Sequence, residues 1–578
     1  MVVRRPFPTR GVLRRPPIRP VDLLVGAGVV ALLFGVLRLG ESMNVSFVPT
    51  RASEQISTNP ANLPYYAARS LLRMFIALGL SLVFTFVYGT AAARLRRAEK
   101  VLIPVLDILQ SVPILGFLSI TVTGFIALFP GSTLGLECAA IFAIFTSQAW
   151  NMTFSFYHSL ITQPRELDEA ARLYRLTKWQ RFWRLDVPSS MIGLVWNGMM
   201  SFGGGWFFLA ASEAISVLNH HYTLPGIGSY VAAAVAEGSL GKVGIAIVVM
   251  IVMVIAVNVF FWRPLVAWAE KFRMEESEAA ERPRSLVLDT LRRSQLPAAL
   301  GRATRPVGRA LDRLSRPFGL ADYPLTTDPG RQRAGDVAFS VVVGAVAVFG
   351  AWRGLAYIGN TIGFGEFPHA LGLGAITFGR VVVLLVFATL VWVPIGVVIG
   401  MSPRLARYAQ PIVQVLASFP AILLFPFATV AFIDLGISLN LGGILLMALG
   451  AQWYILFNAI AGGMSVPTDL REMSANFGLP RRQRWQRLIL PAIFPFYVTG
   501  GITAAGGAWN ASIVAEVVDF GHHHLAASGL GAYITDATAK GDFPRILTGV
   551  VVMSLYVVGL NRLVWRRLYR LAETRYSL

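Results

Sequence analysis

Long apolar runs, each able to cross a membrane, are the feature that most constrains how this chain folds. A helix needs about 20 consecutive, mostly apolar residues to span roughly 30 Å of hydrocarbon. The sequence contains twelve such runs, at 22–40, 70–93, 102–129, 134–158, 191–215, 243–265, 337–357, 374–400, 408–433, 440–463, 491–515 and 543–565. We therefore predict an all-α polytopic membrane protein with about twelve transmembrane helices.

The composition excludes several other classes of protein. Of the 578 residues, 55% are apolar and 14% charged, against roughly 25% charged in an ordinary soluble chain. The single cysteine, Cys138, excludes an internal disulfide and a cysteine-based metal site. The adjacent histidines at 220–221 and 522–524 have no carboxylate or cysteine cluster beside them, so we predict no metal site.

The net charge of +20 is concentrated in short polar segments between the apolar runs. This is the positive-inside pattern of cytoplasmic loops, which sets orientation and requires no nucleic-acid partner. The first segment, 1–21, and the linker, 270–335, are both rich in arginine. With an even number of spans between them, we expect both termini and the linker to be cytoplasmic, in a multi-pass protein of a bacterial inner membrane.

An internal repeat divides the chain into two halves. We predict an N-terminal tail at 1–21, a first half at 22–269, the linker at 270–335 and a second half at 336–578. Because each half has an even number of spans, the two repeats should be parallel and related by an axis along the membrane normal. Residues that recur at an offset of 303 include Trp150/Trp453, Pro164/Pro467, Glu169/Glu472, Pro188/Pro491, Trp206/Trp509, Glu213/Glu516 and Asn258/Asn561; at an offset of 307 they include Arg73/Arg380, Pro104/Pro411 and Ser111/Ser418.

A charged segment lies between the fourth and fifth spans of each half. The segments begin at Pro164 and Pro467, and acidic residues follow each proline. Proline suits the first turn of a helix, and carboxylates favour the exposed N–H groups there. We predict a short cytoplasmic helix in each half whose exposed apolar side chains dock into a groove of another protein.

These segments resemble the coupling loop of ABC-importer permeases. The family pattern is Glu-Ala-Ala, three residues, Gly, nine residues, and a hydrophobic–x–Leu-Pro ending. Two departures occur: Arg175 replaces the glycine of the first half, and Met473-Ser474 replace the alanines of the second. Because an arginine in a left-handed turn costs about 1–2 kcal/mol, we expect the first loop to turn differently, and the sequence leaves open whether the two halves couple equally. The residues carried over are Glu169, Ala170, Ala171, Tyr174, Arg175, Pro188, Glu472, Ser474, Ala475, Gly478 and Pro491.

Downstream segments resemble the branch of this family that serves nitrate, sulfonates and taurine. They include 514–517, 529–533, 541–543 and 561–566. The resemblance implies the type I permease fold, two halves fused in one chain, and import of a small solute, an anion such as nitrate, bicarbonate, a sulfonate or taurine. It also implies two copies of a separate ATPase subunit and a substrate-binding protein outside the membrane. The chain itself lacks a Walker A motif, since Gly241-Lys242 is followed by Val243; we therefore predict that it is not an enzyme, and that ATP and Mg²⁺ bind the partner and no cofactor binds this chain.

Polar residues inside the spans are candidates for a substrate pathway. The alternative for each is an interhelical hydrogen bond or core packing. A second set lies near the outer ends of the spans and could form an electropositive vestibule, or else Arg–Glu pairs. The pathway candidates are Gln110, Ser111, Asn151, Trp206, Gln414, Ser418, Gln452, Trp509 and Asn510, and the vestibule candidates are Arg73, Glu213, Arg380 and Glu516.

Two other functional classes compete with the permease. A secondary transporter of the major facilitator type also has two parallel six-helix halves, but its charged loop would lie between the second and third spans, where this chain has only 94–100. A membrane-embedded enzyme would need a catalytic cluster that the spans lack. For the linker, we favour a flexible tether over an amphipathic helix at 291–314 whose arginines contact membrane lipid.

Overall fold

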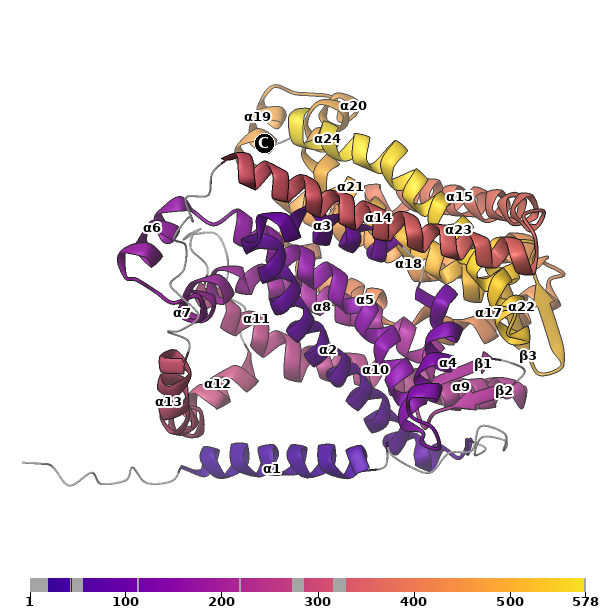
Figure 1. Ribbon diagram of the computed structural model, residues 1–578, viewed down its shortest axis with the longest axis horizontal. Coiled ribbons are helices and arrows are strands. Elements are labelled where there is room, and N and C mark those ends of the chain that lie inside the picture. Colours follow the sequence, from indigo (N-terminus) through magenta and orange to yellow (C-terminus); the bar gives the residue numbers. More distant parts are fainter. Residues whose placement is uncertain are drawn as a thin grey trace, which may run out of the picture.

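The computed structural model describes residues 19–41, 43, 56–111, 114–217, 220–272, 285–314 and 329–575. Helices form almost all of this part of the chain (Figure 1), which confirms the all-α polytopic class. Within the described residues, eight helices are long and apolar enough to cross a membrane, or nine with one bent pair. The eight are Pro20–Glu41, Pro60–Arg94, Leu240–Phe272, Val337–Thr361, Glu366–Gly400, Leu439–Ser465, Arg481–Ala515 and Phe543–Ala572.

The two halves repeat the same order of helices. In each half one helix packs between two others: α5 lies between α2 and α8, and α18 lies between α15 and α21. The halves also contact each other, because α16 packs on α8 and α23 packs on α3. The bounds are α2 (Leu63–Arg94), α3 (Arg96–Ser111), α4 (Leu118–Leu128), α5 (Leu134–Ile161), α8 (Val187–Glu213) and α10 (Leu240–Val257), then α15 (Glu366–Gly400), α16 (Pro403–Ser418), α17 (Phe425–Asp434), α18 (Leu439–Ser465), α21 (Leu490–Ala515) and α23 (Phe543–Leu560).

Two expected spans are broken helices. The run at 408–433 forms α16 and α17, which are bent by 81°, and Pro420 caps the 3₁₀ turn η7 (Ala421–Leu424) between them. The run at 102–129 likewise forms α3, the 3₁₀ turn η2 (Ile114–Phe117) and α4. Pro420 lacks the N–H that would continue α16, so the helix ends before it and the chain turns. The expected spans 134–158 and 191–215 form α5 and α8, which are 28 and 27 residues long. Their polar side chains make them less hydropathic than the eight apolar helices given above.

A π-helical turn precedes the fifth span in each half. It covers Phe182–Asp186 (η3) in the first half and Trp485–Ile489 (η8) in the second. Pro188 and Pro491 each occupy the second position of the helix that follows. A proline has no N–H to donate to the preceding turn. The π turn before each proline therefore sacrifices no backbone hydrogen bond at the proline, because an α-helix could not form one there either.

Two β-hairpins interrupt the helical fold, and the sequence prediction missed both. β1 (Ala214–Val217) pairs antiparallel with β2 (His220–Thr223), and β3 (Val517–Phe520) pairs antiparallel with β4 (His523–Ala526). They follow α8 and α21, and a short helix follows each hairpin: α9 (Ile227–Ala236) and α22 (Leu530–Lys540). β1, β2 and β3 lie together at one end of the molecule (Figure 1), which we call the hairpin end.

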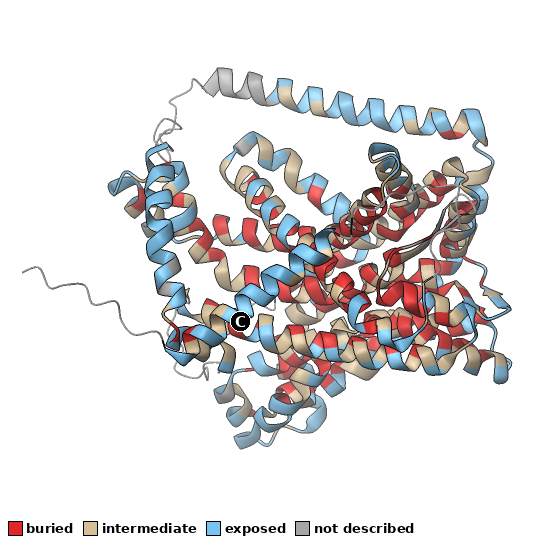
Figure 2. Cartoon of the chain, turned by 90° about the horizontal axis from the view of Figure 1, so that it is seen from below, coloured by how far each residue is buried: buried red, intermediate tan, exposed pale blue. Residues whose placement is uncertain are grey.

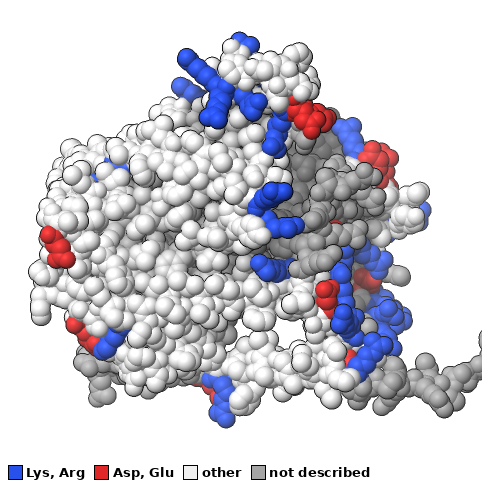
Figure 3. All heavy atoms as spheres, turned by 180° about the vertical axis from the view of Figure 1, so that it is seen from behind, with Lys and Arg blue, Asp and Glu red and all other residues white. Residues whose placement is uncertain are grey.

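Basic side chains gather at the opposite end of the molecule. Figure 3 shows lysine and arginine along one edge and at the top, beside a broad face with few charges. This end carries α6 (Arg165–Leu173), α7 (Lys178–Arg181), α19 (Thr468–Asn476) and α20 (Arg481–Arg484) (Figure 1). We call it the arginine-rich end.

The first helix of each half lies outside the packed body. In α1 (Pro20–Glu41) and in the span part of α14 (Pro329–Thr361), only 6% of the apolar window is buried. Figure 2 shows one of these helices, α14, as a largely pale-blue helix at the margin, apart from the red core. Exposed apolar helices of this length suit direct contact with lipid.

Part of the linker is helical, so a flexible tether does not describe it. Residues 285–314 form α12 (Leu286–Arg293) and α13 (Leu296–Leu314), and α12 packs against α11 (Arg263–Ala269). The neighbouring segments 273–284 and 315–328 lie outside the described residues.

Candidate coupling helices and transport cavities

The first coupling helix, α6, forms where the sequence predicts it. Pro164 is its N-cap, and Glu166 and Asp168 lie in its first turn. Asp168 also accepts a hydrogen bond from Arg181, which is 97% buried on the following helix α7. Thr177 and Gln180 form a capping box that starts α7. Local capping therefore fixes the direction of the chain on both sides of the turn.

The second coupling helix, α19, is attached to the body differently. Pro467 is its N-cap and Asp469 lies in its first turn. Arg471 donates a hydrogen bond to the backbone carbonyl of Met401, at the end of α15, over 2.7 Å. The helix is therefore anchored by an arginine to the second span of its own half.

Both coupling helices end in the same left-handed turn. Arg175 has a φ of 46° and Gly478 a φ of 59°. The N–H of Leu176 bonds to the carbonyl of Ala171 over 3.1 Å, and Leu479 makes the equivalent bond over 3.1 Å. These are Schellman turns. The expectation that Arg175 makes the first loop turn differently is wrong, because this bond and the capping of α7 hold the arginine in the left-handed conformation.

An exposed aromatic side chain precedes each left-handed residue. Tyr174 is 76% exposed and its repeat partner Phe477 is 75% exposed. Leu173, at 81%, and Met473, at 50%, extend the two apolar surfaces. Large apolar side chains on an otherwise charged surface mark a contact site for another protein. The sequence prediction missed Leu173, Met473 and Phe477; the aromatic at both repeat positions was the available signal.

The other predicted coupling residues differ in exposure. Ala171 and Ser474 are buried and help attach the helices to the body. Those on the outside are Glu169, Glu472 and Ala475, and those of intermediate exposure are Ala170, Pro188 and Pro491.

An open cavity lies between the halves. α3 and α5 of the first half line it together with α21 and the turn η9 (Asn561–Trp565) of the second. Gln110 donates to Asn151 over 3.0 Å, and Asn510 accepts from the backbone of Ile114 over 2.9 Å. Four predicted pathway residues line this first interface cavity: Gln110, Asn151, Trp509 and Asn510.

A second interface cavity lies at the related contact between the halves. α8 and α16 line it, and Gln414 joins it to two smaller cavities that Ser418 also lines. Trp206 lines one of these smaller cavities. α8 and α16, which line the second interface cavity, are the repeat counterparts of α21 and α3, which line the first.

Tyr454 lies between the two sets of cavities. It lines the first interface cavity and one of the smaller cavities. A side-chain carbon added at Gly204 or Gly507 would lie 3.2 or 3.3 Å from the tyrosine side chain. The repeat partner of Tyr454 is Asn151, so the tyrosine is a bulky group in only one half. It narrows the space between α8 and α21.

One predicted pathway residue, Gln452, is not in these cavities, and a second, Ser111, cannot be placed. The side-chain oxygen of Gln452 accepts a hydrogen bond from Trp392 over 2.9 Å, between α18 and α15, and Gln452 lines none of the four cavities described. The side chain of Ser111 lies outside the described residues. Gln452 therefore makes the interhelical contact that was the alternative to a pathway role.

The vestibule candidates form buried Arg–Glu ion pairs, which was the alternative to an electropositive vestibule. Arg73 is fully buried and contacts Glu137 at 2.6 Å and Glu213 at 2.7 Å. Ser70 donates to Glu213 over 2.6 Å, as does the backbone N–H of Gly228 over 2.7 Å. The cluster pairs every charge it contains and joins the second span to the segment after the hairpin.

The second half repeats this cluster with fewer charges. Arg380 contacts Glu516 at 2.7 Å, and Thr377 donates to Glu516 over 2.8 Å. Arg380 also donates to Asn440, which occupies the position of Glu137 in the repeat. In each half, the buried cluster joins the second span to the segment that follows the β-hairpin. The role of both clusters is therefore structural.

Comparison with known proteins agrees with the repeat. Residues 63–266 and 392–577 each match the family described as binding-protein-dependent transport system inner membrane component. Among the described residues, no group of three or more histidine, cysteine or acidic side chains could hold a metal ion.

Several curated relatives are similar to about a third of the chain. A nitrate import permease protein of Leptolyngbya laminosa is 28% identical over 190 residues, which are 33% of this chain and 64% of the relative. A bicarbonate transport system permease protein of Synechococcus elongatus is 26% identical over 177 residues, 31% of this chain and 60% of the relative. A putative aliphatic sulfonates transport permease protein of Bacillus subtilis is 28% identical over 161 residues, 28% and 55%. The chain thus spans less than two thirds of the length of these relatives.

The two family matches together cover more than half of the chain, and they fall on the two helical halves described above. The two coupling helices and the cavities between the halves lie inside the matched segments. This chain belongs to the family of binding-protein-dependent transport system inner membrane components, as a multi-pass permease with the family domain present twice.

Proposed function

We propose that this chain is the permease of an ATP-driven importer, and that it moves a small solute by alternating access. The observation that carries the proposal is the pair of coupling helices, which end in the same turn and present Tyr174 and Phe477 at the arginine-rich end. Two equivalent surfaces on one chain suit two copies of one partner. The partner is an ATPase that binds ATP and Mg²⁺, and the arginine-rich end is cytoplasmic.

The cavities between the halves support a route for the solute. They are lined by paired helices from both halves, and Tyr454 separates them. A rotation of the halves about their contact would move α8 and α21 relative to this side chain, and would open one set of cavities while it closes the other. A substrate-binding protein would dock at the hairpin end.

We propose an anion, such as nitrate, bicarbonate, a sulfonate or taurine, as the solute. The second interface cavity is lined by Arg263 and Arg407 and by three amide side chains, and no acidic residue is among its described lining residues. The first interface cavity instead contains Asp107 and no basic lining residue in the described chain. The charges therefore favour the second cavity as the anion's exit, and the relatives named for nitrate, bicarbonate and sulfonates point to the same class.

Uptake into proteoliposomes tests the proposal. The chain, reconstituted with its ATPase and binding protein, should accumulate one of these anions only when ATP is supplied, and dissipating the ion gradients should not stop uptake. Arg263→Gln with Arg407→Gln should slow uptake, whereas Asp107→Asn should not. Uptake that needs an ion gradient and no ATP would identify a secondary transporter of the major facilitator type and overturn the proposal.

A further inference from the structure

We propose that α13 is an amphipathic helix that lies on the membrane surface and binds anionic lipid headgroups. Its arginines repeat at three- and four-residue spacings, so they lie on one face of the helix. Its larger apolar residues repeat in the same way on the opposite face. The arginines are Arg302, Arg305, Arg309 and Arg313, and the apolar residues are Leu296, Val307, Leu311 and Leu314.

Within the described residues, the apolar face of α13 is largely uncovered. Val307 is 60% exposed, Leu311 42% and Leu314 67%. The helix carries one acidic residue, Asp312, against its four arginines. An apolar stripe opposite a basic face is the pattern of helices that bury one side at the lipid boundary and place their cations among phosphates. A groove in a soluble protein would not need the basic face, so lipid is the occupant that fits both.

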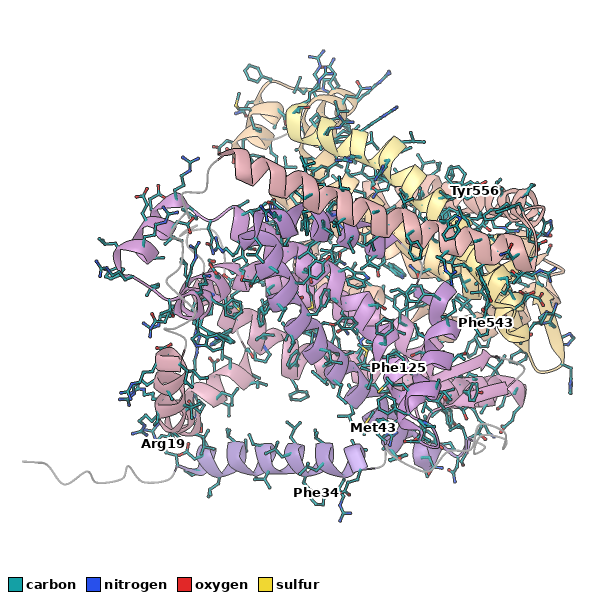
Figure 4. All side chains as sticks on the ribbon, in the orientation of Figure 1. Arg19, Phe34, Met43, Phe125, Phe543 and Tyr556 are labelled. Atoms are coloured by element: carbon teal, nitrogen blue, oxygen red, sulfur yellow. The ribbon has the colours of Figure 1, made fainter. Side chains whose placement is uncertain are left out.

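The position of α13 places it at the level of the headgroups. Asp22, in the first turn of the exposed span α1, accepts hydrogen bonds from the Ser294 hydroxyl over 2.8 Å and from the N–H of Gln295 over 2.6 Å. Arg19 donates to the carbonyl of Arg293 over 3.2 Å. Figure 4 shows Arg19 at this junction, and Phe34 farther along α1 on the apolar span. α13 therefore begins beside the first turn of α1, at the level where this span would enter the membrane.

The direction of α13 fits a helix in the plane of the membrane. Figure 1 shows α13 almost end-on, whereas α1 runs across the picture, so the two axes cross. A helix that continued the direction of α1 would leave the headgroup layer. A helix that crosses α1 near its first turn can remain within this layer.

One contact joins α13 to the coupling region. Arg184, in the π turn after the first coupling helix, contacts Asp312 at 2.8 Å. A lipid-bound α13 would therefore hold the coupling region of the first half close to the membrane. The second half has no counterpart of this contact in the described chain, because the linker joins the halves only once.

Hydrogen exchange of the full chain in lipid nanodiscs tests the proposal without any ATPase or solute. The amides of 296–314 should exchange at least tenfold more slowly in discs that contain phosphatidylglycerol than in discs of phosphatidylcholine alone, since each arginine near an anionic surface contributes about a fivefold gain in binding. High salt should reduce the protection, because it screens the attraction.

A matched pair of variants separates this site from net charge. Changing Arg302, Arg305, Arg309 and Arg313 to glutamine should abolish the difference between the two kinds of disc. The same change at four exposed arginines of α24 (Arg566–Arg575), namely Arg566, Arg567, Arg570 and Arg575, should leave it intact. Exchange that is equal in the two kinds of disc, whether fast or slow, would overturn the proposal: fast exchange would identify a solvent-exposed linker, and slow exchange a contact that does not depend on lipid charge. The lipid comparison uses the unaltered chain, so the test stands even if a variant fails to fold.

Discussion

At the scale of single residues, position in the repeat matters more than residue type. Arg175 and Gly478 take the same left-handed conformation, although glycine adopts it without cost and arginine does not. The sequence shows the departure from glycine but not its outcome, because the outcome depends on hydrogen bonds that form only when the neighbouring helix is capped.

Replacing Arg175 with glycine should stabilise the protein by about 1 kcal/mol, since the left-handed conformation strains any residue with a Cβ. The melting temperature of the purified protein in detergent measures the effect. Arg172→Gly is the control: Arg172 is also exposed but lies within α6, where glycine costs about 1 kcal/mol. If Arg175→Gly lowers the melting temperature as Arg172→Gly does, Arg175 makes a favourable contact that outweighs the strain.

The buried ion pairs show where charge prediction fails. The sequence shows a repeated set of charged residues, Arg73, Glu213, Arg380 and Glu516. Whether these side chains face water depends on how the segment after each hairpin folds over them. Glu137 and Asn440, which complete the clusters, lie at equivalent repeat positions, and that equivalence was the signal available in the sequence.

Arg380→Met should destabilise the second half strongly, by about 3–5 kcal/mol, because Glu516 would remain buried without its cation. Size-exclusion profiles and melting temperatures of the solubilised protein report the loss. Lys540→Met, which breaks the ion pair with Asp536 between side chains that are 61% and 62% exposed, should cost less than about 1 kcal/mol. Similar losses in the two variants would mean that the cluster at Arg380 is solvated.

At the scale of elements, the sequence predicts what hydropathy and capping encode. The long apolar helices, the coupling helices and their proline starts were all visible in it. The hairpins were not, because four-residue strands give too short an alternation to detect. The π turns were also missed, since they arise from packing around a proline and not from residue preference.

The coupling helices should lose their partner when their aromatic residues become charged. Tyr174→Asp and Phe477→Asp should each weaken ATPase binding at least tenfold, because each removes a large apolar contact and would bury an unpaired charge. Co-purification of the ATPase at graded concentrations measures this. Leu286→Asp, at a residue that is 87% exposed on α12 and outside the coupling helices, should bind the ATPase normally; equal losses at all three sites would exclude a specific role for the aromatics.

At the scale of the whole molecule, the fused repeat determines the arrangement of the helices. The offset of 303 predicts two equivalent halves, and the structure shows equivalent helices, turns and hairpins. It also shows where equivalence ends: Tyr454 against Asn151, Asp107 against Gln414, and, within the described residues, a linker helix that contacts Arg184 of the first half. Such differences are possible because both halves lie in one chain and can change separately.

The number of ATPase subunits bound to one chain tests whether both coupling helices bind an ATPase. The complex should be purified from its native membrane in mild detergent and weighed intact by mass spectrometry. Two ATPase subunits should be bound to each chain, one at each coupling helix. A folded chain that carries no ATPase under these conditions would contradict this prediction.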